Sequence, residues 1–164
     1  MFTSCSKDDD EKTSGEDLTP VAAVMDYALT VGDDMLNTLN LTVEYYDANG
    51  KVQTETLTQK RWTKNIRAKL PAKLGVRLKA QLKDGINPTT IEKFTAEYGY
   101  YYNGYAVSAN DKVVGNVVSY GPNSTTQAMK GDKINLWLEN HTNGVVKFLF
   151  DFAANGQATD SQWQ

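Results

Sequence analysis

Apolar and polar residues alternate with a period of two along most of the chain, and this period predicts strands rather than helices. In the first run, residues 21–31, Met25, Tyr27 and Leu29 fall on one face, with polar Asp26 on the other. The same alternation recurs after each turn signal, so we expect an all-β fold. The further runs cover residues 39–46, 52–58, 62–70, 74–83, 94–108, 113–120 and 146–152.

Turn sequences between these runs indicate how neighbouring strands pair. Asn49–Gly50 supplies the positive φ that a tight hairpin requires between the second and third runs. The fourth and fifth runs are predicted to form another hairpin, interrupted at Pro71. Two turn signals compete in the long aromatic run; we place the turn at residues 109–111 and interpret Gly104 as a bulge.

Only residues 123–130 predict a helix, one or two turns long, with Asn123 or Ser124 as its N-cap. Residues 134–138 are predicted to form a strand that pairs with the last run across the Asn143–Gly144 turn. About eight or nine strands at this spacing, with one short helix, predict an antiparallel, immunoglobulin-like β-sandwich. An eight-stranded meander barrel is the alternative.

The N-terminal residues differ in composition from the strands that follow. Residues 6–19 contain two lysines, six acids and one apolar side chain. They cannot bury enough surface to offset the entropy lost on ordering. We therefore predict a lipoprotein signal remnant and flexible acidic tether at residues 1–19, one β-sandwich domain at 20–155 and a short tail at 156–164. No apolar run is long enough to form a membrane-spanning helix.

The only cysteine of the chain, Cys5, stands just ahead of the acidic residues. Phe2-Thr3-Ser4-Cys5 resembles the lipobox of bacterial lipoproteins, and Cys5-Ser6-Lys7-Asp8-Asp9-Asp10 resembles the export signal of Bacteroidetes surface lipoproteins. The resemblance implies that Cys5 becomes the acylated N-terminus, anchored in the outer leaflet of the outer membrane. Only four residues precede Cys5, so it also implies a truncated signal peptide. The alternative is a disordered acidic tail that carries an unrelated cysteine.

The residue counts exclude several kinds of chemistry. With one cysteine and one histidine, the chain has no Cys₄ or Cys₂His₂ zinc site and no intrachain disulfide. No Gly-x-Ser-x-Gly motif accompanies His141, so we expect no serine hydrolase site. Asp47-x-Asn49-Gly50 lacks the remaining ligands of a calcium loop, and a hairpin turn accounts for it. We expect no metal and no cofactor. A glycosidase built on two carboxylates stays open through Glu44, Glu92, Glu97 and Glu139.

Positive charge is concentrated in residues 60–83, which contain nine cations and no acid in a chain of net charge −3. Such a patch is suited to a polyanion, such as a sulfated glycan or the phosphates of lipopolysaccharide. The alternative is the solvated face of one hairpin, whose lysines protect an edge strand. Nucleic acid is not expected as a partner of an exported protein. The residues that we assign to the patch are Arg67, Arg77, Lys79 and Lys83.

Aromatic residues provide a second candidate surface. Tyrosines stand on both faces of the run at residues 94–108, and because both faces cannot be core, some tyrosines must meet solvent or a partner. Trp137 is out of phase with its apolar neighbours, so we expect its indole on the outside of the sheet. Outward aromatic rings indicate a sugar-stacking platform, whereas cross-strand aromatic pairing is the structural alternative. The predicted ligand-binding residues are Trp137, Tyr98, Tyr100 and Tyr102.

These observations predict a non-catalytic lipoprotein, held at the cell surface by a lipid anchor in the outer membrane. By its resemblance to Bacteroidetes surface lipoproteins, we expect it to bind a polysaccharide or to belong to a surface protein complex. Two alternatives remain open. One is a glycoside hydrolase that uses two carboxylates. The other is a pilus or adhesin-like subunit that acts through an exposed strand edge.

Overall fold

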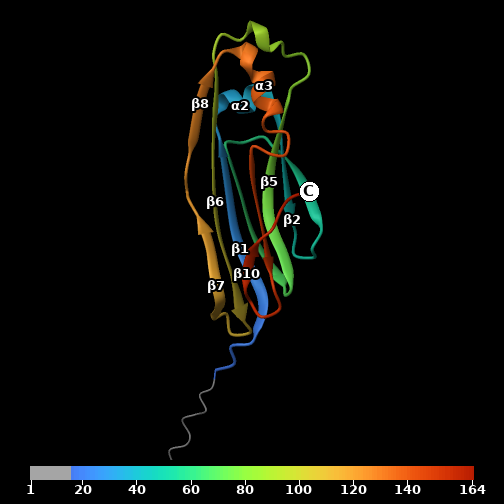
Figure 1. The fold of residues 1–164 in the computed structure, drawn as a ribbon, viewed down its shortest axis with the longest axis vertical. Coiled ribbons are helices and arrows are strands. Elements are labelled where there is room, and N and C mark those ends of the chain that lie inside the picture. Colours follow the sequence, from blue (N-terminus) through green and yellow to red (C-terminus); the bar gives the residue numbers. More distant parts are fainter. Residues whose placement is uncertain (1–15) are drawn as a thin grey trace, which may run out of the picture.

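The computed structural model describes residues 16–164, whose strands form two antiparallel sheets packed face to face (Figure 1). One sheet has the order β4-β1-β6-β7, with β8 also paired to β6, and the other has the order β10-β9-β5-β2-β3. The all-β sandwich is confirmed, and the meander alternative is wrong because the strands divide into two separate sheets. The strands are β1 (Pro20–Val31), β2 (Leu39–Tyr46), β3 (Val52–Leu57), β4 (Arg61–Lys69), β5 (Ala72–Leu82), β6 (Phe94–Ser108), β7 (Val113–Tyr120), β8 (Thr125–Met129), β9 (Val146–Phe152) and β10 (Ala158–Asp160).

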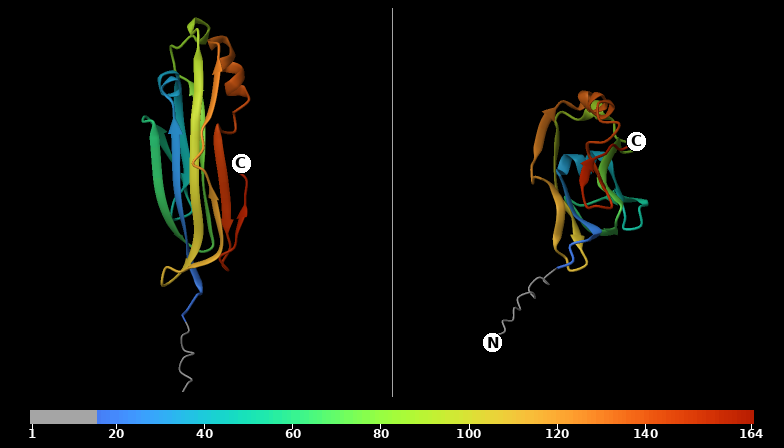
Figure 2. Two further views of the ribbon diagram at one scale, coloured as in Figure 1. Left: turned by 90° about the vertical axis from the view of Figure 1, so that its left-hand side faces the viewer. Right: turned by 60° about the horizontal axis from the view of Figure 1, so that its bottom comes forward.

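Strand β6 runs the length of the first sheet, as Figure 2 shows from the side. One of its edges pairs with β1, and its other edge pairs with β8 near Phe94 and with β7 near Val107. The pairing with β7 shifts register between Gly104 and Ala106, so the predicted bulge is confirmed. The turn after β6 is also where the sequence predicts it, with Asp111 at positive φ.

The fourth and fifth runs do not form the predicted hairpin. β4 pairs only with β1 and is an edge strand, whereas β5 lies between β2 and β9 in the other sheet. The reason is burial: residues 74–78 of β5 are all buried, which requires a strand on each side and cover on both faces. β4 instead exposes most of its alternate residues, as an edge strand does.

Two predicted elements have the wrong secondary structure: a predicted strand is a helix, and the predicted helix is a strand. Residues 134–139 form helix α3 (Ile134–Glu139), in which Ile134 and Trp137 are buried and Leu136 is 54% exposed. This burial follows the i, i+3 spacing of a helix rather than the alternation that we expected. The predicted helix is instead β8, where adjacent β-branched threonines favour an extended chain along the edge of β6.

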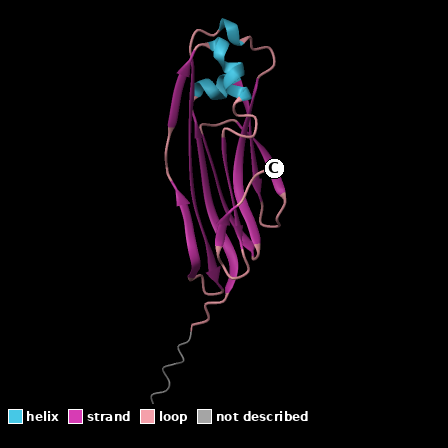
Figure 3. Ribbon diagram, viewed as in Figure 1, coloured by secondary structure: helices cyan, strands magenta, loops and turns pink. Residues whose placement is uncertain are grey.

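The helical segments gather at one end of the sandwich, and the chain enters β1 at the opposite end (Figures 1 and 3). They are α2 (Asp33–Thr38), which the sequence did not predict, α3, and the 3₁₀ turns η2 (Pro88–Thr90) and η3 (Gly131–Lys133). The predicted boundary at residue 155 is too early, because β10 pairs with β9 and Trp163 is only 9% exposed. The residues assigned to a tail are therefore part of the fold.

Candidate functional site

A recess of about 730 Å³ lies on the outer face of the second sheet, between β2, β5 and helix α3. Successive side chains of a strand point to opposite faces, so alternate residues of β2 face the recess while Leu41 and Val43 face the core. We call this recess the polar groove. Its lining residues are Asn40, Thr42, Glu44, Lys79, Ala80, Gln81, Leu82, Asn135, Leu138, Glu139 and Thr142.

Strand register builds the floor of the polar groove from cross-strand polar pairs. In the antiparallel pairing of β2 with β5, Asn40 lies opposite Gln81 and Thr42 lies opposite Lys79. The next pair on this face, Glu44 with Arg77, ends the row. Opposite residues in such a ladder are close enough for their side chains to interact. Amides, hydroxyls and charged groups therefore alternate over a short distance, with hydrogen-bond donors beside acceptors.

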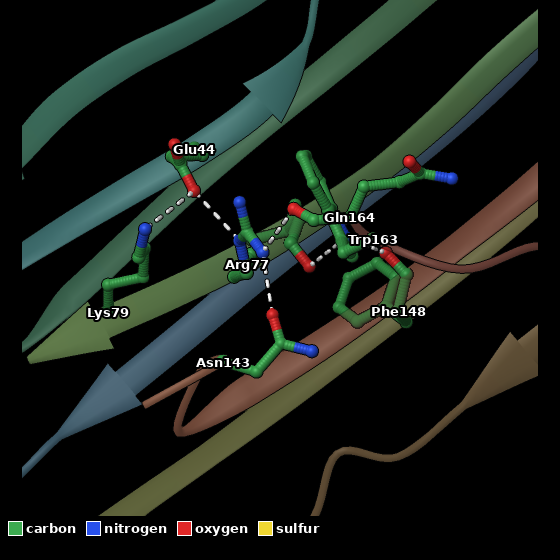
Figure 4. Close-up of polar contacts among 8 residues, drawn as sticks. Glu44, Arg77, Lys79, Asn143, Phe148, Trp163 and Gln164 are labelled. Carbon is green, nitrogen blue, oxygen red and sulfur yellow. Dashed lines mark hydrogen bonds and ion pairs between the residues drawn. The ribbon is translucent and has the colours of Figure 1, made fainter. Parts of the chain in front are cut away.

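Arg77 fixes one end of the polar groove (Figure 4). It is 8% exposed, and its Nε donates to Glu44 Oε1 at 2.8 Å. Its Nη1 donates to Asn143 Oδ1 at 2.8 Å and to the main-chain oxygen of Gln164 at 3.2 Å. Lys79 Nζ lies 4.0 Å from the same Glu44 oxygen. A charge-assisted bond to a buried guanidinium holds a carboxylate in one geometry, so Glu44 faces the groove preorganised.

The charges at the polar groove balance. Glu44 and Glu139 carry two negative charges, and Lys79 and the adjoining Arg77 carry two positive charges. The remaining polar lining consists of neutral amides and hydroxyls. A site of this kind attracts neither strong anions nor strong cations, and it offers many hydrogen bonds to an uncharged ligand.

The four cations of the predicted polyanion patch are not brought together. Arg67 is on β4 in the other sheet and pairs with Asp111 at 3.0 Å. Arg77 is buried, and Lys79 lines the polar groove. Lys83 Nζ donates to the main-chain oxygen of Leu36 at 2.7 Å. The patch fails as one surface because β4 and β5 belong to different sheets, and the basic side chains of β4 lie on an edge strand.

Tyr98, Tyr100 and Tyr102 do share one face of β6, but that face points toward the other sheet. Tyr100 stacks on Phe148 of β9 with centroids 5.7 Å apart, and on Tyr120 of β7 at 4.8 Å. Tyr100 and Tyr102 line a slot of about 320 Å³ at the edge of the sandwich. Burial, with Tyr120 nearby, raises the pKa of Tyr100 to about 12, so its hydroxyl stays protonated at neutral pH.

Tyr120 is a residue of this aromatic cluster that the sequence analysis missed. It is 42% exposed and lies opposite Tyr102 in the pairing of β6 with β7. Its ring stacks on Tyr102 as well, with centroids 5.9 Å apart. The sequence signal was its place at the end of the strand that follows the tyrosine run, since hairpin neighbours face each other.

Trp137 is not an outward platform, and this prediction is wrong. The residue is 5% exposed on helix α3, where its ring contacts Phe94, Tyr98 and His141 at centroid distances of 6.3, 6.4 and 4.4 Å. The expected outward position depended on a strand at residues 134–138, and the helix turns the indole into the core. Trp137 therefore closes the end of the sandwich beside Tyr98.

The remaining sequence candidates are turns or lie outside the described residues. Asp47 Oδ1 accepts hydrogen bonds from the backbone N–H groups of Asn49 and Lys51, so this segment is the predicted hairpin turn. Within residues 16–164, no group of three or more histidines, cysteines or acids has a metal-binding arrangement. No helix in the same range is long and apolar enough to cross a membrane. Cys5 lies outside the described residues.

Of the four glutamates that kept a two-carboxylate enzyme open, Glu44 and Glu139 line the polar groove, and Glu92 and Glu97 do not. No protein-family model, no curated protein and no solved structure matches this chain. Because the polar groove holds two of these glutamates, its chemistry bears on both candidate functions, glycan binding and glycoside hydrolysis.

Proposed function

We propose that this protein is a non-catalytic surface lipoprotein whose β-sandwich binds neutral glycans in the polar groove. The observation that carries the proposal is the row of cross-strand polar pairs, Asn40 with Gln81, Thr42 with Lys79 and Glu44 with Arg77. With Glu139 of helix α3, the charges along this row balance. A sugar ring presents several hydroxyls, each of which donates and accepts hydrogen bonds. An amide side chain satisfies both roles at once, and an ionised carboxylate accepts from the sugar hydroxyls.

The size and the apolar part of the lining support the same ligand class. A groove of about 730 Å³ falls in the range of roughly 300–1,000 Å³ that small-ligand sites occupy. Leu138 of helix α3 adds apolar surface among the polar groups. The C–H face of a sugar is suited to such surface, while its hydroxyls reach the amides. Because the charges balance, a sulfated or phosphorylated glycan gains no net attraction.

The position of the polar groove fits a protein held by its N-terminus. Residues 16–19 lead into β1 at one end of the sandwich, and helix α3, which forms one wall of the groove, lies at the other (Figure 1). An anchor at Cys5, as the lipobox-like residues imply, leaves the groove at the end away from the membrane. A ligand outside the cell then reaches it without contact with the bilayer.

Retention on insoluble polysaccharides tests glycan binding. Gln81→Ala and Asn40→Ala remove exposed amides from the groove floor, so folding is expected to stay intact. Gln127→Ala, an exposed strand glutamine on β8, is the matched control. We expect the double variant to lose retention while Gln127→Ala keeps it. Equal retention by both variants, or no retention of the wild type on any glycan tested, contradicts the proposal.

Detergent partition tests the anchor separately. Expressed behind a full lipoprotein signal peptide, the wild type is expected to enter the detergent phase, and Cys5→Ala is expected to stay in the aqueous phase. Membrane association that survives Cys5→Ala would show that this cysteine is not the anchor. The result leaves the glycan experiment unaffected, because retention is measured on the folded domain.

A second candidate is a glycoside hydrolase, favoured by the placement of Glu44 and Glu139 on the same groove. Its signature is the release of reducing sugar from a retained polysaccharide. Glu139→Gln keeps the size of the side chain and removes one carboxylate. Release by the wild type that this variant abolishes would make the protein an enzyme; retention without release supports the binding function.

A further inference from the structure

Residues 161–164 lie across the outer face of the second sheet, next to the polar groove (Figure 4). Trp163 Nε1 donates to the main-chain oxygens of Val76 and Phe148, at 3.1 and 3.0 Å. Its ring lies 4.8 Å from the Arg77 guanidinium and 5.2 Å from the ring of Tyr46. We call this seat, formed by Tyr46, Val76, Arg77 and Phe148, the indole cradle.

The indole cradle contacts both the tryptophan side chain and the backbone of the residue that follows it. The two carbonyls accept the indole N–H, and Arg77 offers its face to the ring by a cation–π contact. The same guanidinium donates to the main-chain oxygen one residue further along. The cradle therefore recognises a tryptophan followed by a peptide or terminal carbonyl, which is a recognition pattern for an extended peptide.

The indole cradle does not depend on the segment that fills it. Without Trp163 and Gln164, Arg77 keeps its bonds to Glu44 and Asn143, so no buried charge is left unpaired. Val76 and Phe148 lie opposite each other in the β5–β9 ladder and stay part of the sheet. A site whose own groups stay satisfied when it empties is preformed, and a ligand binds it without the cost of ordering the site.

The segment itself has few backbone attachments. Between β10 and the cradle, the N–H of Ser161 donates to the oxygen of Leu149 at 2.8 Å. Gln162 and Gln164 are exposed, and the tryptophan side chain is the one buried anchor of the segment. Segments with few buried contacts and little pairing open at low free energy.

We propose that the indole cradle is a docking site for a tryptophan-bearing, extended segment of a partner protein, and that residues 161–164 fill it when no partner is bound. The occupant is inferred from the segment seated there, whose indole and following carbonyl meet matched groups. The cradle and the polar groove share Arg77, but the indole contacts with Tyr46, Val76 and Phe148 lie outside the groove lining, so the inference does not rest on glycan binding.

A peptide titration on the full chain tests the proposal. A tethered segment has an effective concentration of about millimolar, so the tether must be weakened before an added peptide competes. Trp163→Ala in the full chain removes the anchor and leaves the cradle. The probe is the peptide Ala-Thr-Asp-Ser-Gln-Trp-Gln, and its control has alanine in place of tryptophan.

By calorimetry, we expect the probe to bind the Trp163→Ala chain about tenfold or more tightly than the wild type, with no binding of the control peptide. Adding Arg77→Gln to Trp163→Ala is expected to weaken the probe about tenfold. Absence of binding to the Trp163→Ala chain at millimolar probe overturns the proposal, as does equal binding of the control peptide. If the wild type is a dimer and the probe dissociates it, the cradle binds the segment of a second copy of the chain. That result would overturn the proposal of a partner protein.

If Trp163→Ala fails to fold, the wild type provides the same test. With 5-fluorotryptophan in the chain, the fluorine signal of Trp163 is identified by its absence in Trp163→Phe. Excess probe is expected to move this signal toward the position of a solvent-exposed indole. A signal that stays unchanged with several-fold excess over the effective concentration overturns the proposal.

Discussion

Strands β4 and β5 follow one another in the chain and are both rich in lysine and arginine, yet one arginine on each strand has an opposite environment. On β4, Arg67 pairs with Asp111 at 3.0 Å, and both side chains are about half exposed or more. On β5, Arg77 is buried and has Glu44, Asn143, a main-chain carbonyl and an indole around it. One strand is an edge, and the other is the centre of a sheet.

The difference teaches that partner number and burial, rather than the count of cations, indicate where charge has a role. Exposed ion pairs contribute about 0–1 kcal/mol, because water already solvates both groups. A buried pair costs desolvation to form and several kcal/mol to break, because one charge is then left without a partner. The cluster of cations at residues 60–83 therefore includes the arginine with a structural role, but it does not form the predicted polyanion surface.

Arg77→Ala is the change with the largest expected effect. It leaves the partly buried Glu44 without its guanidinium and removes the seat of Trp163. We expect the free energy of unfolding to fall by about 3 kcal/mol, measured by urea denaturation. A loss below about 1 kcal/mol would place Arg77 with the exposed cations of β4 and remove the contrast between the strands.

Trp163→Ala is expected to follow, with a loss of about 2 kcal/mol in urea. The indole covers β5 and β9 and contacts Arg77, but it lies on the outer face rather than between the sheets. Trp163→Phe keeps the ring and loses the N–H donor, so its loss should lie between those of wild type and alanine. A phenylalanine variant as unstable as the alanine variant would show that the two hydrogen bonds, not the ring, hold the segment.

Acid titration sharpens the comparison on the β4 side. Lys64 of β4 hydrogen-bonds Glu55 of β3 and lowers the pKa of this carboxyl, with help from Tyr45 and Trp62 and against partial burial. A pKa lowered by folding contributes stability above the unfolded pKa, and this is lost as the pH falls through the folded value. Glu55→Gln should therefore have a flatter stability profile below about pH 5. Identical acid limbs for the variant and wild type would contradict the ion pair.

Arg67→Ala is expected to have the smallest effect, a loss of less than about 1 kcal/mol that shrinks further with added salt. Its partner Asp111 is in the exposed turn after β6. Thermal melts at low and high ionic strength measure both the loss and its salt dependence. A salt-independent loss as large as that of Arg77→Ala would mean that position on the edge does not determine the contribution of a cation.

Local patterns predicted what local physics decides. The Asn49–Gly50 hairpin, the bulge at Gly104 and the turn after β6 each depend on a few neighbouring residues, and each is where the sequence predicts it. The sheet that β4 joins depends on distant partners, so its pairing with β1 was not visible. Helix α3 was missed because its apolar residues fit both periods, and packing against Phe94 selects the helix.

The polar groove could be predicted only in part. Asn40, Thr42 and Glu44 alternate with apolar residues in the sequence, which already places them together on an outer face. Their partners on β5 follow from a register that the sequence does not reveal, and the wall supplied by helix α3 required the correct structure for residues 134–139. Two hydrogen-bond partners of Arg77, Asn143 and the main-chain oxygen of Gln164, also lie far along the chain.

The most direct test of the account is a two-dimensional amide NMR titration of the wild-type chain with neutral oligosaccharides from a retained polysaccharide. The account predicts shifts confined to residues on β2, β5 and α3 that line the polar groove, including the side-chain amides of Asn40, Gln81 and Asn135. Shifts centred instead on the slot of Tyr100 and Tyr102 would move the site to the other edge of the sandwich. A spectrum that stays unchanged at saturating sugar would contradict glycan binding by this domain.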